Sequence, residues 1–311
     1  MKKLPVFYYR STVITIDDEP MVSDALSLLL IKEFNIKSFS RPREFLEFIQ
    51  TYQIPLSDDI ALRECTEHED FDTVRHIIID FNVPELHSLI QHPKRNDEIS
   101  VIIVDYRMPE INGLTLCKLL KRMHVRAKII LLTGGADLQT AIDAFNDNII
   151  DRFIEKRSTT LSEDIINAVT ELSHQYYYEK TSSILTHLEA RKSSSLSDPD
   201  FITFFNSWRK DHSITEYTLI DKNGSFCMMN RDGESSYFII HTDNSLDSFI
   251  EINEDEADAT PFLESIKRRD LIPFFGIGKD SWSIAPREWK NHFHQANMLT
   301  GRENYYWAVI P

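Results

Sequence analysis

Five residues suited to metal and phosphate chemistry each follow or end a short apolar segment of the sequence. Asp17 and Asp18 follow TVITI, Asp105 ends SVIIVD, Thr133 ends KIILLT, and Lys156 ends IIDRFIEK. Three carboxylates gathered at one site repel one another unless a hard cation lies among them, and ligands that are all oxygen favour Mg²⁺ over Zn²⁺. A lysine and a hydroxyl beside such a cation suit phosphoryl transfer, in which catalysis is mostly positioning and neutralisation of charge.

The segment around Asp105 indicates how these residues reach one place. Residues 101–104 are uniformly apolar, as expected of a parallel strand that is buried on both faces. Met108 and Pro109 then break regular structure, and Gly113 permits a tight turn. Ligands of open α/β sheets bind beyond the carboxyl ends of the strands, so Asp105 is expected at such a site.

The spacing of apolar runs predicts the elements that carry the site. Strands are expected near residues 12–17, 36–39, 100–105, 127–132 and 149–155. Helices are expected near residues 20–34, 42–50, 112–124 and 137–147. This alternation, with right-handed crossovers, predicts an α/β fold: a flavodoxin-like, doubly wound parallel sheet of five strands.

These residues, in this order, resemble the receiver domain of two-component response regulators. The resemblance implies that Asp105 accepts a phosphoryl group from a sensor histidine kinase. It further implies that Asp18 binds Mg²⁺ directly and that Asp17 acts largely through water. The third protein ligand would be the backbone carbonyl of Arg107, two residues past the acceptor.

The same resemblance assigns the groups that respond to the phosphoryl group. Thr133 matches the hydroxyl that turns in to meet it, and Lys156 matches the lysine that pairs with it. Phe153 matches the aromatic side chain that changes rotamer. Two positions depart from the common receiver pattern: Arg157 follows the lysine where proline is usual, and Gly134 follows the threonine.

The interval between Asp17 and Asp105 is longer than a minimal receiver needs. It spans 88 residues (105 − 17), and the excess lies at about residues 51–98. This insertion holds an acidic stretch and an apolar piece, VRHIIIDF, at residues 74–81. The favoured interpretation is a solvated loop with one buried helix, and the alternative is a contact for a partner or a second copy. Because structureless loops of this length are uncommon, part of it is expected to be ordered.

Three parts are expected along the chain. The receiver domain would occupy residues 1–161, an extended helix and linker residues 162–198, and an output domain residues 199–311. Apolar residues recur at helical spacing up to about residue 191, with a break at Glu179-Lys180. This helix is either the last receiver helix with a tail or a signalling helix that pairs with a second copy.

The output domain is predicted to be α+β. Residues 216–242 contain three β-rich runs separated by Asn-Gly and Asp-Gly, which are strong hairpin signals. A helix is expected near residues 260–270, and further strands in IPFFGI and YYWAVI. With DFNVPELHSLIQHP in the insertion and the ending GRENYYWAVI, the whole chain resembles the response regulators of Lqs-type quorum-sensing systems.

Charge argues against direct DNA binding by the output domain. Residues 201–311 contain 11 basic and 17 acidic residues, a net charge of −6 (11 − 17), and no basic helix-turn-helix pattern. The sequence contains no GG(D/E)EF-like or EAL-like run, so cyclic-dinucleotide chemistry is not expected. His292 and His294 are interpreted as structural or surface residues rather than metal ligands.

Composition favours a two-domain signalling protein of the cytoplasm. Cys65, Cys117 and Cys227 are scattered and lack CxxC spacing, which predicts neither a disulfide framework nor a zinc site. No apolar run has the length of a membrane span, and MKKLPVFYYR lacks the apolar stretch of a signal peptide.

Two functions of different classes follow from the sequence. The first is a response regulator, not an enzyme, that transmits its signal as a phosphorylation-dependent homodimer or by docking a partner, in quorum-sensing regulation. The second is a receiver that controls an output domain with a nucleotide or small-molecule pocket, or with weak enzymatic activity. Such a pocket would draw on the aromatic residues of the C-terminal region, which include Trp282 and Trp289.

Overall fold

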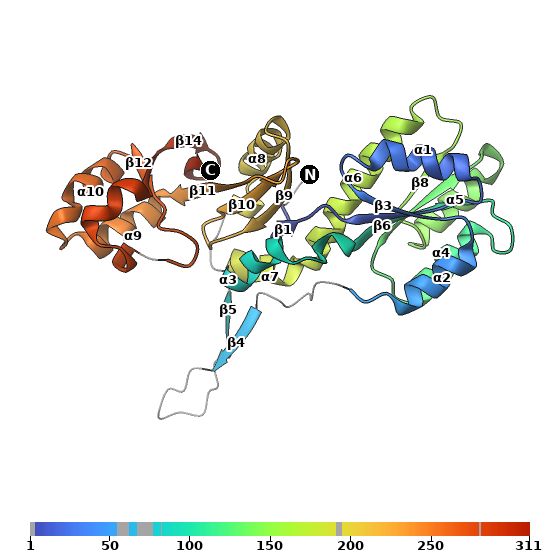
Figure 1. The fold of residues 1–311 in the computed structure, drawn as a ribbon, viewed down its shortest axis with the longest axis horizontal. Helices are drawn as coiled ribbons and strands as arrows, with labels where there is room; N and C mark the ends of the chain where they lie inside the picture. Colours follow the sequence, from blue (N-terminus) through green and yellow to red (C-terminus); the bar gives the residue numbers. More distant parts are fainter. Residues whose placement is uncertain (1–3, 55–61, 67–76, 82, 191–194, 280) are drawn as a thin grey trace. The chain divides into compact units, whose positions relative to one another are not determined.

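A computed structural model describes residues 4–54, 62–66, 77–81, 83–190, 195–279 and 281–311 (Figure 1). The chain forms two compact units, each assembled from separate stretches of sequence. One, here called the parallel-sheet unit, holds Tyr9–Ser57 and His92–Lys180. The other, the antiparallel-sheet unit, holds Met1–Tyr8, Asp58–Gln91 and Thr181–Pro311.

The parallel-sheet unit contains the predicted sheet of five strands. Its order is β3-β2-β6-β7-β8, and every neighbouring pair is parallel. The strands are β2 (Thr12–Ile16), β3 (Asn35–Phe39), β6 (Ile99–Asp105), β7 (Lys128–Thr133) and β8 (Arg152–Glu155). The helices are α1 (Pro20–Leu30), α2 (Pro42–Thr51), α4 (Gly113–Arg122), α5 (Leu138–Asn146) and α6 (Leu161–Lys180). The flavodoxin-like α/β prediction is confirmed.

Helices cover both faces of this sheet (Figure 1). On one face, α2, α4 and α5 pack against Ile102 and Val104 of β6. On the other face, α1 and α6 pack against Val101 and Ile103. All four β6 side chains are buried, which explains why this strand shows no polar alternation in the sequence.

The antiparallel-sheet unit is built on a six-stranded sheet in the order β1-β9-β10-β11-β15-β14. Its strands are β1 (Phe7–Tyr8), β9 (Ile214–Leu219), β10 (Phe226–Asn230), β11 (Ser235–Thr242), β14 (Asn297–Thr300) and β15 (Asn304–Ile310). The helix α8 (Pro199–Asp211) packs on it through Phe201 and Phe205, which contact Phe226, Phe238 and Tyr305. The C-terminal α+β prediction is confirmed.

A second core lies between the helices α9 (Asp243–Asn253) and α10 (Thr260–Lys267) and the short strand pair β12 (Leu271–Pro273) and β13 (Phe293–Gln295). Phe249, Phe275, Trp289 and Phe293 contact one another there. Trp289 is 1% exposed, so this tryptophan is accounted for by packing.

The insertion differs from its favoured interpretation. Ile77–Phe81 forms β5, which pairs antiparallel with β4 (Leu62–Thr66). A buried helix over residues 74–81 is therefore wrong for residues 77–81, and residues 74–76 lie outside the described residues. The following helix α3 (Val83–Ser88) supplies Leu86, whose backbone carbonyl accepts a hydrogen bond from the Thr218 hydroxyl of β9 (3.5 Å). The helix α3, at the end of the insertion, thus packs on the antiparallel sheet.

The structure also divides the chain differently from the three expected parts. The N-terminal segment joins the antiparallel sheet through β1, which pairs with β9 at Phe7↔Thr218. The helix α6 stays within the parallel-sheet unit to its end at Lys180, and α7 (Ser182–Ala190) lies at the start of the third stretch of the other unit. The single long helix therefore breaks at Thr181, close to the break noted at Glu179-Lys180. Within the described residues, no helix is both long and apolar enough to cross a membrane.

Candidate functional site

The carboxyl ends of β2 and β6 bring three carboxylates together. The two strands are neighbours in the sheet, with Ile16 paired to Val104, so residues that follow them lie side by side. Carboxylate oxygens of Asp17, Asp18 and Asp105 all lie within 4.8 Å of one another. The predicted acidic cluster therefore forms.

Lys156 reaches into this cluster from the end of β8. Its Nζ lies 2.9 Å from Oδ2 of Asp17 and 3.0 Å from Oδ1 of Asp105. The backbone places it there, because the N–H of Lys156 donates to the carbonyl oxygen of Thr133 on the neighbouring strand (2.9 Å). The ammonium thus bridges two of the three carboxylates.

Burial strengthens the electrostatic interactions among the charged groups of this site. Asp17 is 1% exposed and Asp105 is 5% exposed. Burial raises the pKa of Asp105 above its ordinary value, although the hydrogen bond from Lys156 opposes the shift. For Lys156, burial lowers the pKa, but hydrogen bonds to Asp17 and Asp105 outweigh it, so the pKa lies above its ordinary value. Lys156 is therefore a fixed positive charge.

Each carboxylate oxygen of Asp17 accepts a hydrogen bond. Its Oδ1 accepts a hydrogen bond from the N–H of Glu19 (2.9 Å), next to Pro20 at the start of α1. Its Oδ2 accepts from Lys156 (2.9 Å). Asp17 therefore fixes the turn that leads into α1, and this turn holds Asp18 beside the other carboxylates.

The donor set fits a hard divalent cation. Three carboxylates and one ammonium leave two uncompensated negative charges when all are ionised, and all candidate ligand atoms are oxygens. Asp18 is the least buried of the three, and it makes no ion pair with Lys156. The backbone N–H of Arg107 donates to Asp105, and its guanidinium pairs with Asp137 (2.7 Å), away from the cluster. Asp137 was not among the sequence-predicted residues, since nothing in its spacing indicates this pair.

The predicted switch residues lie on the neighbouring strands β7 and β8. Thr133 is fully buried at the end of β7, and its hydroxyl donates to the carbonyl oxygen of Gly134 (3.1 Å). Phe153 on β8 is partly buried and meets the ring of Phe145 edge-on at 6.3 Å. The Thr133 hydroxyl is thus hydrogen-bonded to its neighbour, and the Phe153 ring packs against another aromatic ring.

The loop between β6 and α4 requires glycine at position 113 because the backbone of Asp105 lies too close for a side chain. A Cβ at Gly113 would lie 2.0 Å from the backbone oxygen of Asp105, and the Gly113 N–H donates to the carbonyl of Tyr106 (3.0 Å). Asn112 caps α4 by accepting from the N–H of Leu114 (2.9 Å). The absence of a side chain at Gly113 lets α4 begin directly against the backbone of Asp105.

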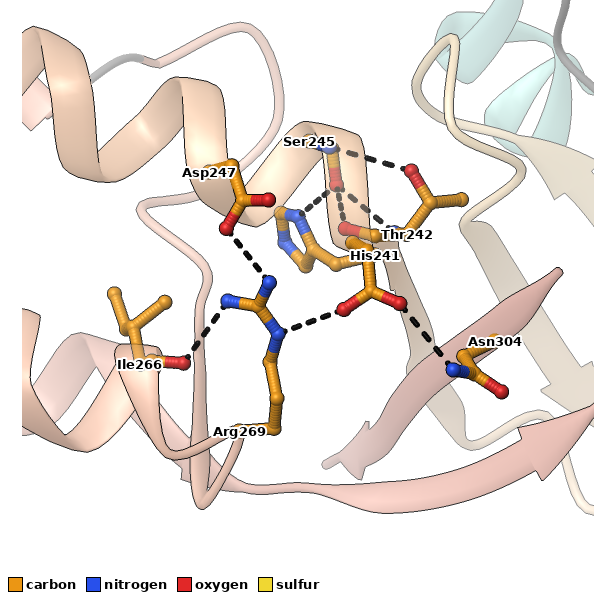
Figure 2. Close-up of polar contacts among 8 residues, drawn as sticks. His241, Thr242, Ser245, Asp247, Ile266, Arg269 and Asn304 are labelled. Carbon is orange, nitrogen blue, oxygen red and sulfur yellow. Dashed lines mark hydrogen bonds and ion pairs between the residues drawn. The ribbon is translucent and has the colours of Figure 1, made fainter.

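The antiparallel-sheet unit has its own charged cluster, drawn in Figure 2. Arg269 pairs with Asp243 (2.8 Å) and Asp247 (2.6 Å) of α9 and donates to the carbonyl of Ile266 (3.2 Å). Burial would raise the pKa of Asp243, but hydrogen bonds from Arg269 and Asn304 outweigh it and lower the pKa. The cluster ties the end of α10 to α9 and is best understood as structural.

A family model and a solved structure of response regulators match this chain. The model of the response regulator receiver domain matches residues 62–170. The structure of the response regulator LqsR of Legionella pneumophila is similar to this chain with a TM-score of 0.76 and 26% identity, covering 98% of this chain and 88% of that one. A response regulator receiver domain protein of Clostridium thermocellum matches with a TM-score of 0.35 and 18% identity, covering 53% of this chain and 95% of that one. No curated protein sequence matches the chain.

The chain therefore carries a response regulator receiver domain. The match at residues 62–170 includes Asp105, Thr133 and Lys156 but begins inside the insertion. The strand β2 and the carboxylates that follow it lie outside this match, although they belong to the same parallel sheet. The insertion separates the two parts of the domain in the sequence and not in the fold.

Proposed function

We propose that this chain is a response regulator that accepts a phosphoryl group on Asp105 from a sensor histidine kinase. The observation that carries the proposal is the position of Lys156, whose ammonium lies within 3.0 Å of both Asp17 and Asp105. A lysine held beside a buried carboxylate at the carboxyl edge of a parallel sheet is suited to neutralise an incoming phosphoryl group.

In this proposal, a carboxylate oxygen of Asp105 attacks the phosphorus atom while the bond from phosphorus to the donor histidine breaks. The electron pair of that bond leaves with the imidazole, and the phosphoryl oxygens lie within reach of Lys156. Asp18, Asp105 and the Arg107 carbonyl would hold Mg²⁺, with Asp17 acting mainly through water. Mg²⁺ would supply charge neutralisation at the phosphoryl oxygens. No turnover of another substrate is assigned to the chain.

Thr133 and Phe153 are proposed to convert phosphorylation into a change of shape. The Thr133 hydroxyl now donates to its neighbour Gly134 and would instead donate to a phosphoryl oxygen. Phe153 would move into the space that Thr133 leaves. Because β8 leads directly toward α6, this movement would alter the surface formed by α5, β8 and α6.

We further propose that the altered surface is used by a second copy of the chain or by a partner, in quorum-sensing regulation. The resemblance to the Lqs-type response regulators supports this role, and a self-complementary contact needs only one surface. Direct DNA binding is not part of the proposal, because residues 201–311 carry a net charge of −6 (11 − 17).

The proposal is tested by phosphoryl uptake from acetyl phosphate with and without Mg²⁺. Wild type should take up label only with Mg²⁺, and Asp105→Asn should take up none. Asp18→Ala should require a much higher Mg²⁺ concentration, whereas the exposed acid of α1 changed in Asp24→Asn should leave the Mg²⁺ dependence as in wild type. Equal uptake by wild type and Asp105→Asn would reject the assignment.

A further inference from the structure

An ion pair next to the acceptor aspartate has no part in the phosphoryl transfer proposed above. Nε of Arg107 donates to Oδ2 of Asp137 at 2.7 Å. Arg107 belongs to the loop between β6 and α4, and Asp137 belongs to the segment between β7 and α5. The first of these loops follows Asp105 and the second follows Thr133. The ion pair therefore ties the loop after the acceptor to the loop after the switch hydroxyl.

The backbone of Arg107 is already bonded to the acceptor. Its N–H donates to a carboxylate oxygen of Asp105. The pKa of Arg107 lies above its ordinary value, chiefly because its guanidinium is hydrogen-bonded to Asp137, and the negative charge of Asp105 acts in the same direction. The guanidinium is thus held by Asp137 while it also feels the charge of the acceptor.

The ion pair is exposed on its arginine side. The Arg107 side chain is 66% exposed, and the Asp137 side chain is 17% exposed. Ion pairs in such contact with water are weak, because solvent screens the attraction and two side chains lose rotamer freedom. The guanidinium can therefore leave Asp137 when a more highly charged anion comes within its reach.

Asp137 has a second use for its carboxylate. It occupies the N-cap position of α5, but within the described residues its side chain makes no capping hydrogen bond. Aspartate is among the best N-cap residues, because its carboxylate accepts from the N–H of the second or third helical residue. These residues are Gln139 and Thr140 in α5. In this structure the carboxylate is bonded to Arg107 instead.

We propose that Arg107 exchanges Asp137 for the phosphoryl group once Asp105 is phosphorylated, and so binds that group as a second cation besides Lys156. This inference rests on the proposed function of Asp105. A phosphoryl group adds nearly two negative charges, and a guanidinium can give it two parallel hydrogen bonds. The released Asp137 caps α5. The exchange also frees the segment that follows Thr133, whose hydroxyl has to turn toward the phosphoryl group.

Beryllofluoride with Mg²⁺ is the probe for this exchange, and its dissociation constant from the full-length protein is measured by calorimetric titration. Arg107→Gln should raise the constant about fivefold, the size of one exposed charge interaction. Asp137→Asn should lower it by a similar factor, because the guanidinium no longer has to leave a carboxylate. An ion pair that only holds the two loops in place predicts weaker binding for both variants.

The double variant shows whether the two side chains act through each other. With Arg107→Gln already present, Asp137→Asn should leave the dissociation constant unchanged, since no guanidinium remains to be released. Arg107→Lys keeps the charge and should recover part of the lost affinity. Arg107→Gln should not weaken the binding of Mg²⁺ alone, because it removes a cation. Arg122 is an exposed arginine in the last turn of α4, so Arg122→Gln should bind beryllofluoride like wild type.

Hydrogen exchange at the first turn of α5 gives a second readout. In wild type, beryllofluoride and Mg²⁺ should slow exchange at the N–H groups of Gln139 and Thr140, where the released Asp137 is expected to cap. In Arg107→Gln, these N–H groups should be protected without the analogue, because Asp137 is already released. In Asp137→Ala, the analogue should give them no added protection.

The outcomes separate this exchange from phosphoryl acceptance itself. The exchange would be overturned by unchanged affinity in Arg107→Gln, by weaker binding in Asp137→Asn, or by an equal effect of Asp137→Asn with and without Arg107. Any of these results alongside normal binding by wild type would leave the role of Asp105 standing. Absence of Mg²⁺-dependent beryllofluoride binding to wild type would overturn both proposals. Thermal unfolding confirms that each variant is folded.

Discussion

At the scale of single residues, the site is an acidic cluster held by one lysine. Asp105 is buried, and its pKa is raised above the ordinary value. A carboxyl group whose pKa is higher in the folded than in the unfolded state stabilises the fold at a pH below its unfolded pKa. It loses this contribution as the pH rises through the folded pKa. Ionised Asp105 therefore costs stability at neutral pH when no cation is bound.

Because ionised Asp105 costs stability, its replacement in Asp105→Asn should stabilise the fold. In metal-free buffer at neutral pH, the variant should unfold at a higher temperature than wild type, by about 2–4 °C for each kcal/mol recovered. The gain should shrink in acid, where wild-type Asp105 is protonated. Thermal unfolding at the two pH values measures it, with Asp24→Asn as the exposed-acid control. A gain that is the same at both pH values would show that the charge of Asp105 is not its cause.

Thr133 is predicted to drive the conformational response to the phosphoryl group rather than to assist its transfer. Its hydroxyl is occupied by the carbonyl of Gly134 in the present state. Thr133→Ala should take up phosphoryl as wild type does but lose the protection from hydrogen exchange that beryllofluoride and Mg²⁺ induce in β7 and β8. Thr133→Ser keeps the hydroxyl and should respond as wild type. A full response of Thr133→Ala would assign the switch to another group.

At the scale of elements, β6 connects two buried charged sites. Its last residue is Asp105, and Glu98 directly precedes its first residue, Ile99. Glu98 is fully buried, and its Oε1 lies 2.8 Å from Nζ of Lys180, the last residue of α6. The Tyr176 hydroxyl donates to the same oxygen. This network fixes the end of α6 to the edge of the sheet opposite Asp105.

Removing the cation of this network should be costly. Lys180→Met leaves Glu98 as a buried unpaired charge, and the free energy of unfolding should fall by about 3–5 kcal/mol. Adding Glu98→Gln should recover most of the loss, because the uncompensated charge is then gone. Denaturant unfolding of the single and double variants measures both effects.

An exposed ion pair between β8 and the same helix provides the control. Arg152 on β8 pairs with Glu171 of α6 (2.7 Å), and Glu171 is largely exposed. Arg152→Met should cost at most about 1 kcal/mol. If Lys180→Met cost no more than this control, the buried network would not be what holds the end of α6.

The elements of the parallel sheet could be predicted because each has a local signal. Uniform apolar runs such as residues 101–104 end in the residues of the site, and strand ends meet at one edge of a parallel sheet. The place of β1 could not be predicted, since a strand of two residues shows no periodicity. Its partner strand β9, which includes Thr218 opposite Phe7, also lies far along the chain. For β5, a short apolar run does not distinguish a strand from a buried helix. Gly113 was identified, but the need for close approach to Asp105 is visible only in the fold.

At the scale of the whole molecule, the chain passes between its two units four times. The changes of unit fall after Tyr8, Ser57, Gln91 and Lys180. The antiparallel-sheet unit therefore contains the N-terminal strand β1 and most of the insertion as well as the C-terminal region. Residues 58–91 of the insertion thus belong to the antiparallel-sheet unit, whereas the residues on either side of them belong to the parallel-sheet unit.

Phosphorylation is predicted to shift a monomer–dimer equilibrium. Wild type with beryllofluoride and Mg²⁺ should have a lower dimer dissociation constant than wild type alone, by only as much as the phosphoryl analogue prefers one state. Asp105→Asn should show the same constant with and without the analogue. Size-exclusion chromatography with light scattering across a concentration series gives these constants. Equal constants in all four samples would favour docking of a different partner instead.

The central claim, that Asp105 accepts the phosphoryl group, is tested most directly by locating the modified residue. Protein treated with acetyl phosphate and Mg²⁺ is reduced with borohydride, which converts an aspartyl phosphate to homoserine, and its peptides are sequenced by mass spectrometry. The account predicts homoserine at position 105 and not at positions 17 or 18, and none without Mg²⁺. Homoserine at another aspartate, with position 105 unmodified, would contradict it.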